Sequence, residues 1–184
     1  MASASTKNVV LGVTGSIAAH KAVDICSLLA KAGCRVNVVM TADAQKFITT
    51  LAFKTLSRQP VITGLYDEEE GWKPAHIRLA DEADLLLIAP ATANVIAKLA
   101  HGLSDDALSC IALALNPAAR ILVAPAMNGK MWLHPATQKN VAELRTRGVN
   151  FHGPEEGMLA CGYEGVGRLS PVEQVAEQAL KLLS

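Results

Sequence analysis

Short apolar runs alternate with longer amphipathic segments along most of the chain. Four runs have the length and the Val, Ile and Leu content of buried strands, and they span Asn8–Val13, Arg35–Met40, Asp84–Ala89 and Arg120–Ala124. The segments with a helical period are Ser16–Ala32, Ala42–Leu56, His76–Ala83, Ala91–Ala100, Asp105–Leu115, Pro135–Arg147 and Pro171–Leu183. This alternation predicts a doubly wound parallel sheet in a three-layer α/β/α sandwich of the Rossmann-like or flavodoxin-like class.

Local signals agree with several of these helix ends. Ser104 and the pair Ser170-Pro171 stand where N-caps precede predicted helices, and Gly33 and Gly148 stand where C-caps end them. No linker, charge block or internal repeat divides the sequence. We therefore predict one domain over residues 1–184, and we expect the short polar segment 1–7 to be disordered.

Composition narrows the function classes. Of the 184 residues, 51% are hydrophobic and 18% are charged, which excludes a disordered chain and indicates burial in an oligomer. The 17 basic and 17 acidic side chains cancel, so nothing favours nucleic acid or an anionic membrane. No apolar run approaches the ~20 residues that span a bilayer, and Met1–Lys7 lacks the apolar core of a secretory signal. A cytoplasmic location is predicted.

Small and polar residues follow the predicted strands at their carboxyl ends, where sheets of this class bind ligands. They are Thr14-Gly15-Ser16, Thr41, Pro90-Ala91-Thr92-Ala93-Asn94 and Pro125-Ala126-Met127-Asn128. The first turn could present helix N–H groups to a phosphate, or it could merely pack a helix on the sheet. Thr92 and Asn94 fit a helix N-cap as well as a ligand contact. The turn is neither GxGxxG nor a P-loop, and no carboxylate follows the second strand, so a mononucleotide such as FMN suits the crevice better than NAD.

Three side chains are candidates for chemistry. His76 could act as a general base, although a lone histidine is more often structural. Asn128 could hydrogen-bond a ligand in a water-poor crevice, or it could satisfy the backbone of its own turn. Cys161 lies in the glycine-rich segment Gly157–Arg168, whose composition is typical of an irregular, mobile lid. The other cysteines lie in or beside apolar helical segments, and no cluster has metal-ligand spacing, so no metal is expected.

Five ordered segments give the chain a more specific resemblance. Pro125–Trp132 (PAMNGKMW) fits the pattern PxMNxxMW in full, and the supporting segments are Gly15–Ala19, the surroundings of His76, Ala89–Asn94 and Ala160-Cys161-Gly162. From about Asn8 to Ser170 the chain resembles the homo-oligomeric flavin-containing cysteine decarboxylases.

The resemblance implies a carboxy-lyase that uses FMN to convert 4′-phosphopantothenoylcysteine into 4′-phosphopantetheine in coenzyme A biosynthesis. FMN would contact Gly15, Ser16, Ile17, Thr41, Thr92, Ala93, Asn94, Val95 and Ala126, and the substrate would contact Asn128, Met158, Leu159 and Ala160. His76 would assist deprotonation as the substrate is oxidised to a thioaldehyde, Asn128 would hold the carboxylate before CO2 leaves, and Cys161 would protonate the enethiol on re-reduction. The family forms trimers or dodecamers with flavin at a subunit interface, so His76 would act largely on ligands of a neighbouring subunit.

Two alternatives stay open within this resemblance. One is a peptidyl-cysteine oxidative decarboxylase, which stops at the enethiol and would not need Ala-Cys-Gly, and the other is a non-catalytic regulatory subunit with an FMN fold. The presence of His76, Asn128 and Cys161 favours the full decarboxylase. His20 stands where many relatives have Tyr, and Arg78 stands where an acidic residue is common. Many bacterial members continue into a ligase that joins cysteine to phosphopantothenate, so a ligase domain or chain is a candidate partner.

Overall fold

A six-stranded parallel sheet forms the centre of the structure, a computed structural model that describes residues 6–66 and 73–184. Its strands are β1 (Asn8–Val13), β2 (Arg35–Met40), β3 (Val61–Ile62), β4 (Leu85–Ala91), β5 (Arg120–Pro125) and β6 (Asn150–Phe151). They lie in the order β3-β2-β1-β4-β5-β6, and every neighbouring pair is parallel. The order reverses between β1 and β4, which confirms the doubly wound sheet and places its crevice there.

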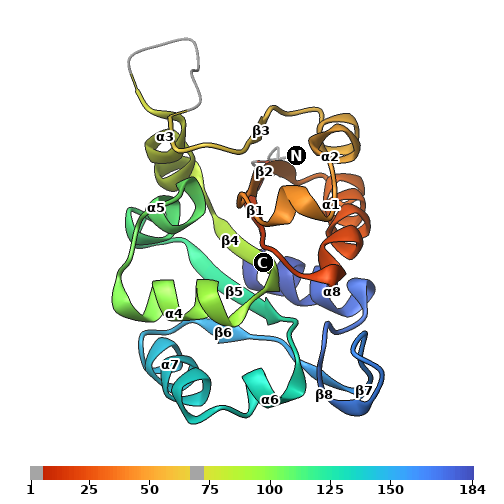
Figure 1. Ribbon diagram of the computed structural model, residues 1–184. Coiled ribbons are helices and arrows are strands. Elements are labelled where there is room, and N and C mark those ends of the chain that lie inside the picture. Colours follow the sequence, from red (N-terminus) through yellow and green to blue (C-terminus); the bar gives the residue numbers. More distant parts are fainter. Residues whose placement is uncertain (1–5, 67–72) are drawn as a thin grey trace.

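Helices cover both faces of this sheet, so the predicted three-layer sandwich is confirmed (Figure 1). One layer holds α1 (Ala22–Lys31), α2 (Thr50–Ser57) and α8 (Val172–Leu183), and the other holds α3 (Ala75–Glu82), α4 (Ala93–His101), α5 (Ala107–Leu113) and α7 (Pro135–Thr146). Val9 and Leu11 of β1 pack into the first layer and Val10 into the second. Burial on both faces explains why the central strands are continuous apolar runs.

Three predicted helices begin or end differently in the structure. Residues of the predicted helix Ala42–Leu56 form a turn, the 3-10 helix η2 (Ala44–Lys46), and then α2, because Thr49 is extended (φ −87°, ψ 162°) as the N-cap residue of α2. The β-branched run at Ile48–Thr50 disfavours one continuous helix. The predicted helix Ser16–Ala32 begins as the 3-10 helix η1 (Ile17–Lys21), and Ala91 ends β4 rather than beginning α4.

The helix caps are partly as predicted. Gly33 and Gly148 have φ of 88° and 85° beyond the ends of α1 and α7, as C-cap glycines do. Ser104 does not cap α5, because Asp106 does so in a capping box with Ser109. Ser170 does not cap α8 either, since the helix begins after Pro171, whose side chain has no hydrogen-bonding group.

Two short elements lie in segments that the sequence left irregular. The four-residue helix α6 (Gly129–Trp132) follows β5, and β7 (Glu155–Met158) pairs antiparallel with β8 (Glu164–Arg168). The prediction of an irregular loop over Gly157–Arg168 is therefore wrong, because this segment forms most of a hairpin that contacts α6 (Figure 1). Its strands are short and rich in glycine, so they lack the alternation that marks a strand in sequence.

The start of the chain lies largely outside the described residues, which include only Thr6 and Lys7 of the segment expected to be disordered. The carbonyl of Lys7 accepts a hydrogen bond of 2.9 Å from Arg35 N, so contacts with the sheet begin one residue before β1. Among the described helices, none has the length and hydropathy needed to cross a membrane.

Candidate functional site

The carboxyl ends of β1 and β4 are joined through one buried threonine. Thr14 Oγ1 donates to the carbonyl of Pro90 at 2.7 Å and accepts from Thr92 N at 3.1 Å. The next residue, Gly15, passes so close to the loop after β2 that a Cβ on it would lie 2.4 Å from Cβ of Asp43. Only glycine fits this turn, so the sequence signal at Gly15 reflects a close approach of two backbone segments.

A cavity of about 450 Å³ opens beside this turn. Ten of the predicted site residues line it: Gly15, Ser16, Ile17, Thr92, Ala126, Asn128, Met158, Leu159, Ala160 and Cys161. They come from the β1–η1 turn, the start of α4, the β5–α6 turn and the β7–β8 hairpin. The fold therefore brings together, around one cavity, segments that are more than 140 residues apart in sequence.

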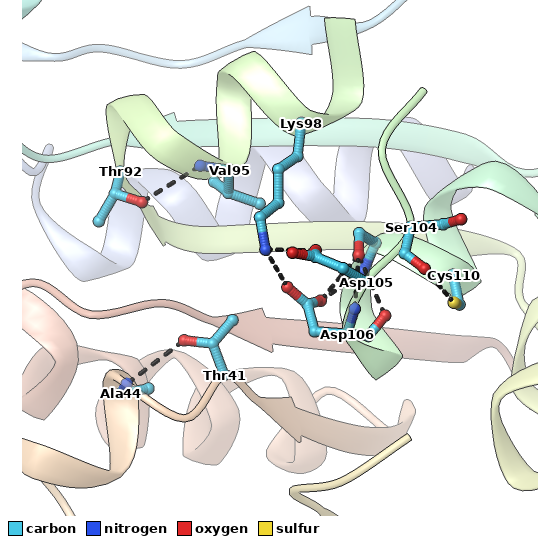
Figure 2. A network of polar contacts seen from close by, with 10 residues as sticks. Thr41, Ala44, Thr92, Val95, Lys98, Ser104, Asp105, Asp106 and Cys110 are labelled. Atoms are coloured by element: carbon cyan, nitrogen blue, oxygen red, sulfur yellow. Dashed lines mark hydrogen bonds and ion pairs between the residues drawn. The ribbon is translucent and has the colours of Figure 1, made fainter. Parts of the chain in front are cut away.

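Five predicted site residues do not line this cavity: Thr41, His76, Ala93, Asn94 and Val95. Thr41 Oγ1 accepts from Ala44 N at 3.3 Å, and Thr92 Oγ1 accepts from Val95 N at 3.3 Å as the N-cap of α4 (Figure 2). Asn94 is exposed on the first turn of α4. Thr41 and the first turn of α4 border the crevice, and the N-cap interpretation of Thr92 is confirmed.

Lys98 of α4 forms ion pairs with two aspartates near the start of α5. Lys98 Nζ lies 2.7 Å from Asp106 Oδ2 and 2.5 Å from Asp105 Oδ1, which links α4 to the start of α5 (Figure 2). Burial opposes the charge on Lys98, but the two carboxylates outweigh it and raise the lysine pKa. Burial likewise opposes the charge on Asp106, and hydrogen bonds from Lys98 and Ser109 outweigh it and lower that pKa. The pair is therefore charged at neutral pH.

Asn128 satisfies its own turn and also reaches the hairpin. Its Oδ1 accepts from Lys130 N at 2.9 Å, which caps α6, and from the Tyr163 hydroxyl at 2.7 Å. Its Nδ2 donates to Cys161 Sγ at 3.3 Å. The turn interpretation of Asn128 is confirmed, because its oxygen caps α6. Its nitrogen contacts the candidate cysteine, and the ligand contact stays a prediction.

The hairpin is docked on the β5–α6 turn by close backbone contacts. Met127 N donates to the carbonyl of Gly167 at 3.0 Å. A Cβ on Gly129 would lie 2.7 Å from the carbonyl oxygen of Val166, and one on Gly167, whose φ is 146°, would lie 2.2 Å from that of Met127. These two glycines allow the approach that carries Cys161 to Asn128.

The lining of the cavity combines apolar and basic residues. Ile17, Ala18, Met131, Leu159 and Leu169 contribute apolar surface, and His20, Lys21 and Arg168 contribute basic groups. Of the residues that the structure describes, no Asp or Glu lines the cavity. His20 Nδ1 lies 2.8 Å from the carbonyl of Ile17, so this nitrogen carries the hydrogen. Such a cavity suits a ligand with flat apolar and anionic parts.

Sequence reasoning missed these basic residues. His20 and Lys21 lie one helical turn after Ser16, so their spacing from the glycine turn was a usable signal. Arg168 belongs to β8, and its Nη2 lies 3.5 Å from Glu155 Oε2 of β7. Because the hairpin was not predicted, nothing in the sequence brought Arg168 to the cavity.

His76 lies apart from the cavity, on the first turn of α3. Its Nδ1 is buried and has no hydrogen-bond partner among the described residues. A buried imidazole nitrogen without a partner costs free energy, and it is a sign of a group that is completed by a ligand or another chain.

The cysteines differ in environment. Cys161 is exposed, whereas Cys26 is buried, and this burial raises its pKa from 9.0 to about 11. Cys34 and Cys110 are half-buried rather than fully buried. Within residues 6–66 and 73–184, no group of three His, Cys, Asp or Glu side chains could hold a metal ion.

Comparison with known proteins gives a consistent picture. The model of the Flavoprotein family matches residues 2–184. The chain is 45% identical over 177 residues to the coenzyme A biosynthesis bifunctional protein CoaBC of Bacillus subtilis, which covers 96% of this chain but only 43% of that protein. It is 43% identical over 173 residues to a probable phosphopantothenoylcysteine decarboxylase of Streptococcus mutans serotype c, which covers 94% of this chain and 97% of the relative.

Solved structures agree with these relatives. A mutant PPC decarboxylase complexed with pantothenoylaminoethenethiol is 30% identical, with a TM-score of 0.86 and coverage of 96% of this chain and 97% of that one. The FMN-dependent cysteine decarboxylase SpaF is 31% identical, with a TM-score of 0.83 and coverage of 98% and 99%.

Proposed function

Since the chain belongs to the flavoprotein family, we propose that it is an FMN-dependent decarboxylase that converts 4′-phosphopantothenoylcysteine into 4′-phosphopantetheine in coenzyme A biosynthesis. The observation that carries the proposal is the contact between Asn128 and Cys161 in the wall of one cavity. A carboxylate-binding amide and a proton-donating thiol then stand side by side, as the two ends of this reaction require.

FMN fits the residues of this cavity. Gly15 brings the backbone of the β1–η1 turn to the cavity without a side chain, and Ser16 and Thr92 add hydroxyl groups beside it. The apolar lining residues suit a flavin ring, and the basic lining residues suit a phosphate. We assign FMN to this cavity, which Ala126 lines, and to the bordering residues Thr41, Ala93, Asn94 and Val95. When bound, FMN supplies a reversible hydride acceptor, so the substrate can be oxidised for decarboxylation and then reduced with no net redox change.

The substrate carries a phosphate and a carboxylate, and both suit a cavity whose described lining residues include no Asp or Glu. Asn128 Nδ2 would donate to the carboxylate while Met158, Leu159 and Ala160 line the path of the pantothenoyl chain. After CO2 has left, the Cys161 thiol would protonate the carbon that lost CO2, and the hydride would return to the neighbouring carbon that bears the sulfur. A location in the reducing cytoplasm accords with the free thiol that this step needs.

His76 supports an active site shared between subunits. It stands outside the cavity of its own chain, and its Nδ1 is buried without a described partner. We propose that this imidazole completes the cavity of a neighbouring subunit in a trimer, or in a dodecamer built from trimers, and takes the proton released as the substrate is oxidised. Three apolar residues that line the cavity are exposed, Ile17, Met131 and Met158, and they are consistent with such a covered face.

The relatives differ in length, and this bears on partners. The chain spans less than half of the bifunctional relative and nearly all of the probable decarboxylase. We propose that residues 1–184 form one decarboxylase domain and that the ligase activity belongs to another domain or chain. The two alternatives, an oxidative peptidyl-cysteine decarboxylase and a regulatory subunit, leave the Asn128–Cys161 contact without a use.

The test is turnover of carboxyl-labelled 4′-phosphopantothenoylcysteine by the flavin-loaded protein without added reductant. We expect labelled CO2 and 4′-phosphopantetheine in equal amounts. A product that lacks two further hydrogens would establish the oxidative decarboxylase instead. Release of no CO2 by protein that holds a full complement of FMN would favour the regulatory subunit.

A further inference from the structure

Tyr163 makes a contact that the proposed reaction does not yet use. Its hydroxyl lies 2.7 Å from Oδ1 of Asn128, 35 residues away in the chain. The contact joins the hairpin to the β5–α6 turn by side chains, beside the backbone bond from Met127 N to the carbonyl of Gly167. Tyr163 also closes the turn that carries Cys161, because its carbonyl accepts from Leu159 N at 3.0 Å.

The neighbours of Asn128 determine which way its amide faces. Lys130 N–H can only donate, so the atom 2.9 Å from it is the amide oxygen. The Tyr163 hydroxyl at the same oxygen must therefore donate as well. Nδ2 then faces Cys161 Sγ with one of its two hydrogens, and the other hydrogen is available to a ligand in the cavity.

The two hydrogen bonds to Oδ1 of Asn128 constrain the amide in different ways. The bond from Lys130 is local, spans two residues and allows the amide to pivot about it. The bond from Tyr163 comes from a separate element and fixes a second direction. Two donors on one oxygen define the plane of the amide, and with it the direction of Nδ2.

We propose that Tyr163 is a positioning residue that acts through Asn128, holding its Nδ2 toward the substrate carboxylate and toward Cys161. This inference rests on the proposed function, because it takes the carboxylate as the ligand of Asn128. Tyr163 itself need not touch the substrate. Its hydroxyl, rather than its ring, is the group that matters.

The test uses the flavin-loaded protein and two ligands that differ in the carboxylate. One is the analogue of the substrate in which a hydroxyl replaces the cysteine thiol, and the other is the product 4′-phosphopantetheine, which has no carboxylate. For Tyr163→Phe we expect the dissociation constant of the analogue, measured by calorimetry, to rise about three- to tenfold, the effect of one weakened hydrogen bond to a charged group. That of the product should be unchanged.

Matched controls separate positioning from folding. The other tyrosine of the chain, Tyr66, is 88% exposed, so Tyr66→Phe should leave both dissociation constants at the wild-type value. Asn128→Ala should weaken binding of the analogue more than Tyr163→Phe does. In the Asn128→Ala background, Tyr163→Phe should have no further effect, because the residue through which it acts is gone.

Three results would overturn the inference: equal weakening of both ligands, an unchanged analogue affinity in Tyr163→Phe, or a loss that persists without Asn128. Each of them leaves wild-type turnover intact, so the proposed function stands. If the wild-type protein instead fails to release CO2 from the substrate, the proposed function fails and the inference falls with it.

Discussion

At the scale of single residues, the proposed reaction depends on the chemistry of Asn128 and Cys161. A neutral amide and an exposed thiol meet at 3.3 Å in a cavity that also carries cationic groups. Because the amide nitrogen donates, the sulfur must accept, which leaves the thiol hydrogen directed elsewhere. The arrangement accords with a thiol that gives its proton to a ligand beside it.

Replacing the thiol should separate the two halves of the reaction. Cys161→Ser leaves Asn128, the proposed carboxylate ligand, in place, and a hydroxyl is a much weaker acid than a thiol. We therefore expect decarboxylation to proceed while the last protonation slows by about two orders of magnitude, the usual range for loss of general acid catalysis.

Mass spectrometry of the products gives the measurement. The product lighter by two hydrogens than 4′-phosphopantetheine should accumulate. Cys110→Ser is the matched control, since that sulfur lies outside the cavity and contacts the carbonyl of Ser104. Normal product from Cys161→Ser at the wild-type rate would show that another group donates the proton.

At the scale of elements, the hairpin and the β5–α6 turn form one docked unit. Gly129→Ala places a Cβ at 2.7 Å from the carbonyl oxygen of Val166, so one of the two backbones must shift. We expect a loss of about 1–3 kcal/mol in the stability of the docked hairpin. Faster hydrogen exchange at Met127 N, which bonds to Gly167, measures it.

A glycine of the same hairpin provides the control. A Cβ on Gly165 would meet nothing closer than 3.6 Å, so Gly165→Ala should leave the exchange rate near wild type. If both variants exchange alike, steric contact at Gly129 does not determine the docking.

The ion pair between α4 and α5 gives a prediction about pH. The pKa of Asp106 is lowered from 3.8, so its charged form stabilises the folded chain above about pH 4, and this contribution is lost as the pH falls through the lowered value. Asp106→Asn keeps the N-cap and removes the charge. We expect unfolding by denaturant at pH 7 to show a loss of about 1–2 kcal/mol that shrinks toward pH 3.

The neighbouring carboxylate separates charge from position. Asp105 also contacts Lys98, but its side chain is 69% exposed against 27% for Asp106, so Asp105→Asn should cost only a few tenths of a kcal/mol. A loss for Asp106→Asn that did not change with pH would mean that its charge is not the stabilising group.

The main elements of the fold could be predicted because the central strands are buried on both faces. Such strands appear in the sequence as unbroken apolar runs, and β1, β2, β4 and β5 were all recognised this way. The hairpin could not be predicted, because its strands are held by contacts with residues about 30 to 40 positions earlier. Tyr163 and Arg168 were missed as site residues for the same reason, because both belong to the hairpin. His20 was missed although it lies one helical turn after Ser16.

At the scale of the whole molecule, the separation of His76 from the cavity predicts a shared active site. His76→Asn and Asn128→Ala should each be inactive alone. In oligomers that contain both kinds of subunit, some cavities combine an intact Asn128 from one chain with an intact His76 from its neighbour. We expect coexpression to restore a substantial part of the wild-type turnover.

The control for this complementation is a pair of variants in one wall. Asn128 and Cys161 of one chain lie in the same cavity. Every cavity in a mixed oligomer of Asn128→Ala and Cys161→Ser chains therefore carries one of the two substitutions, and we expect no activity to be regained. If His76→Asn with Asn128→Ala also regains nothing, although mass analysis shows mixed oligomers, each active site lies within one chain.

We propose that this chain oxidises its substrate, releases CO2 and then reduces the resulting enethiol, with no net redox change. The most direct test is anaerobic mixing of the flavin-loaded protein with 4′-phosphopantothenoylcysteine, with flavin absorbance and product mass followed together. We expect the flavin absorbance to fall and then to return to its starting value, while the product is lighter than the substrate by CO2 alone. Flavin that stays reduced with a product lighter by a further two hydrogens, or flavin that never changes while the substrate persists, would contradict it.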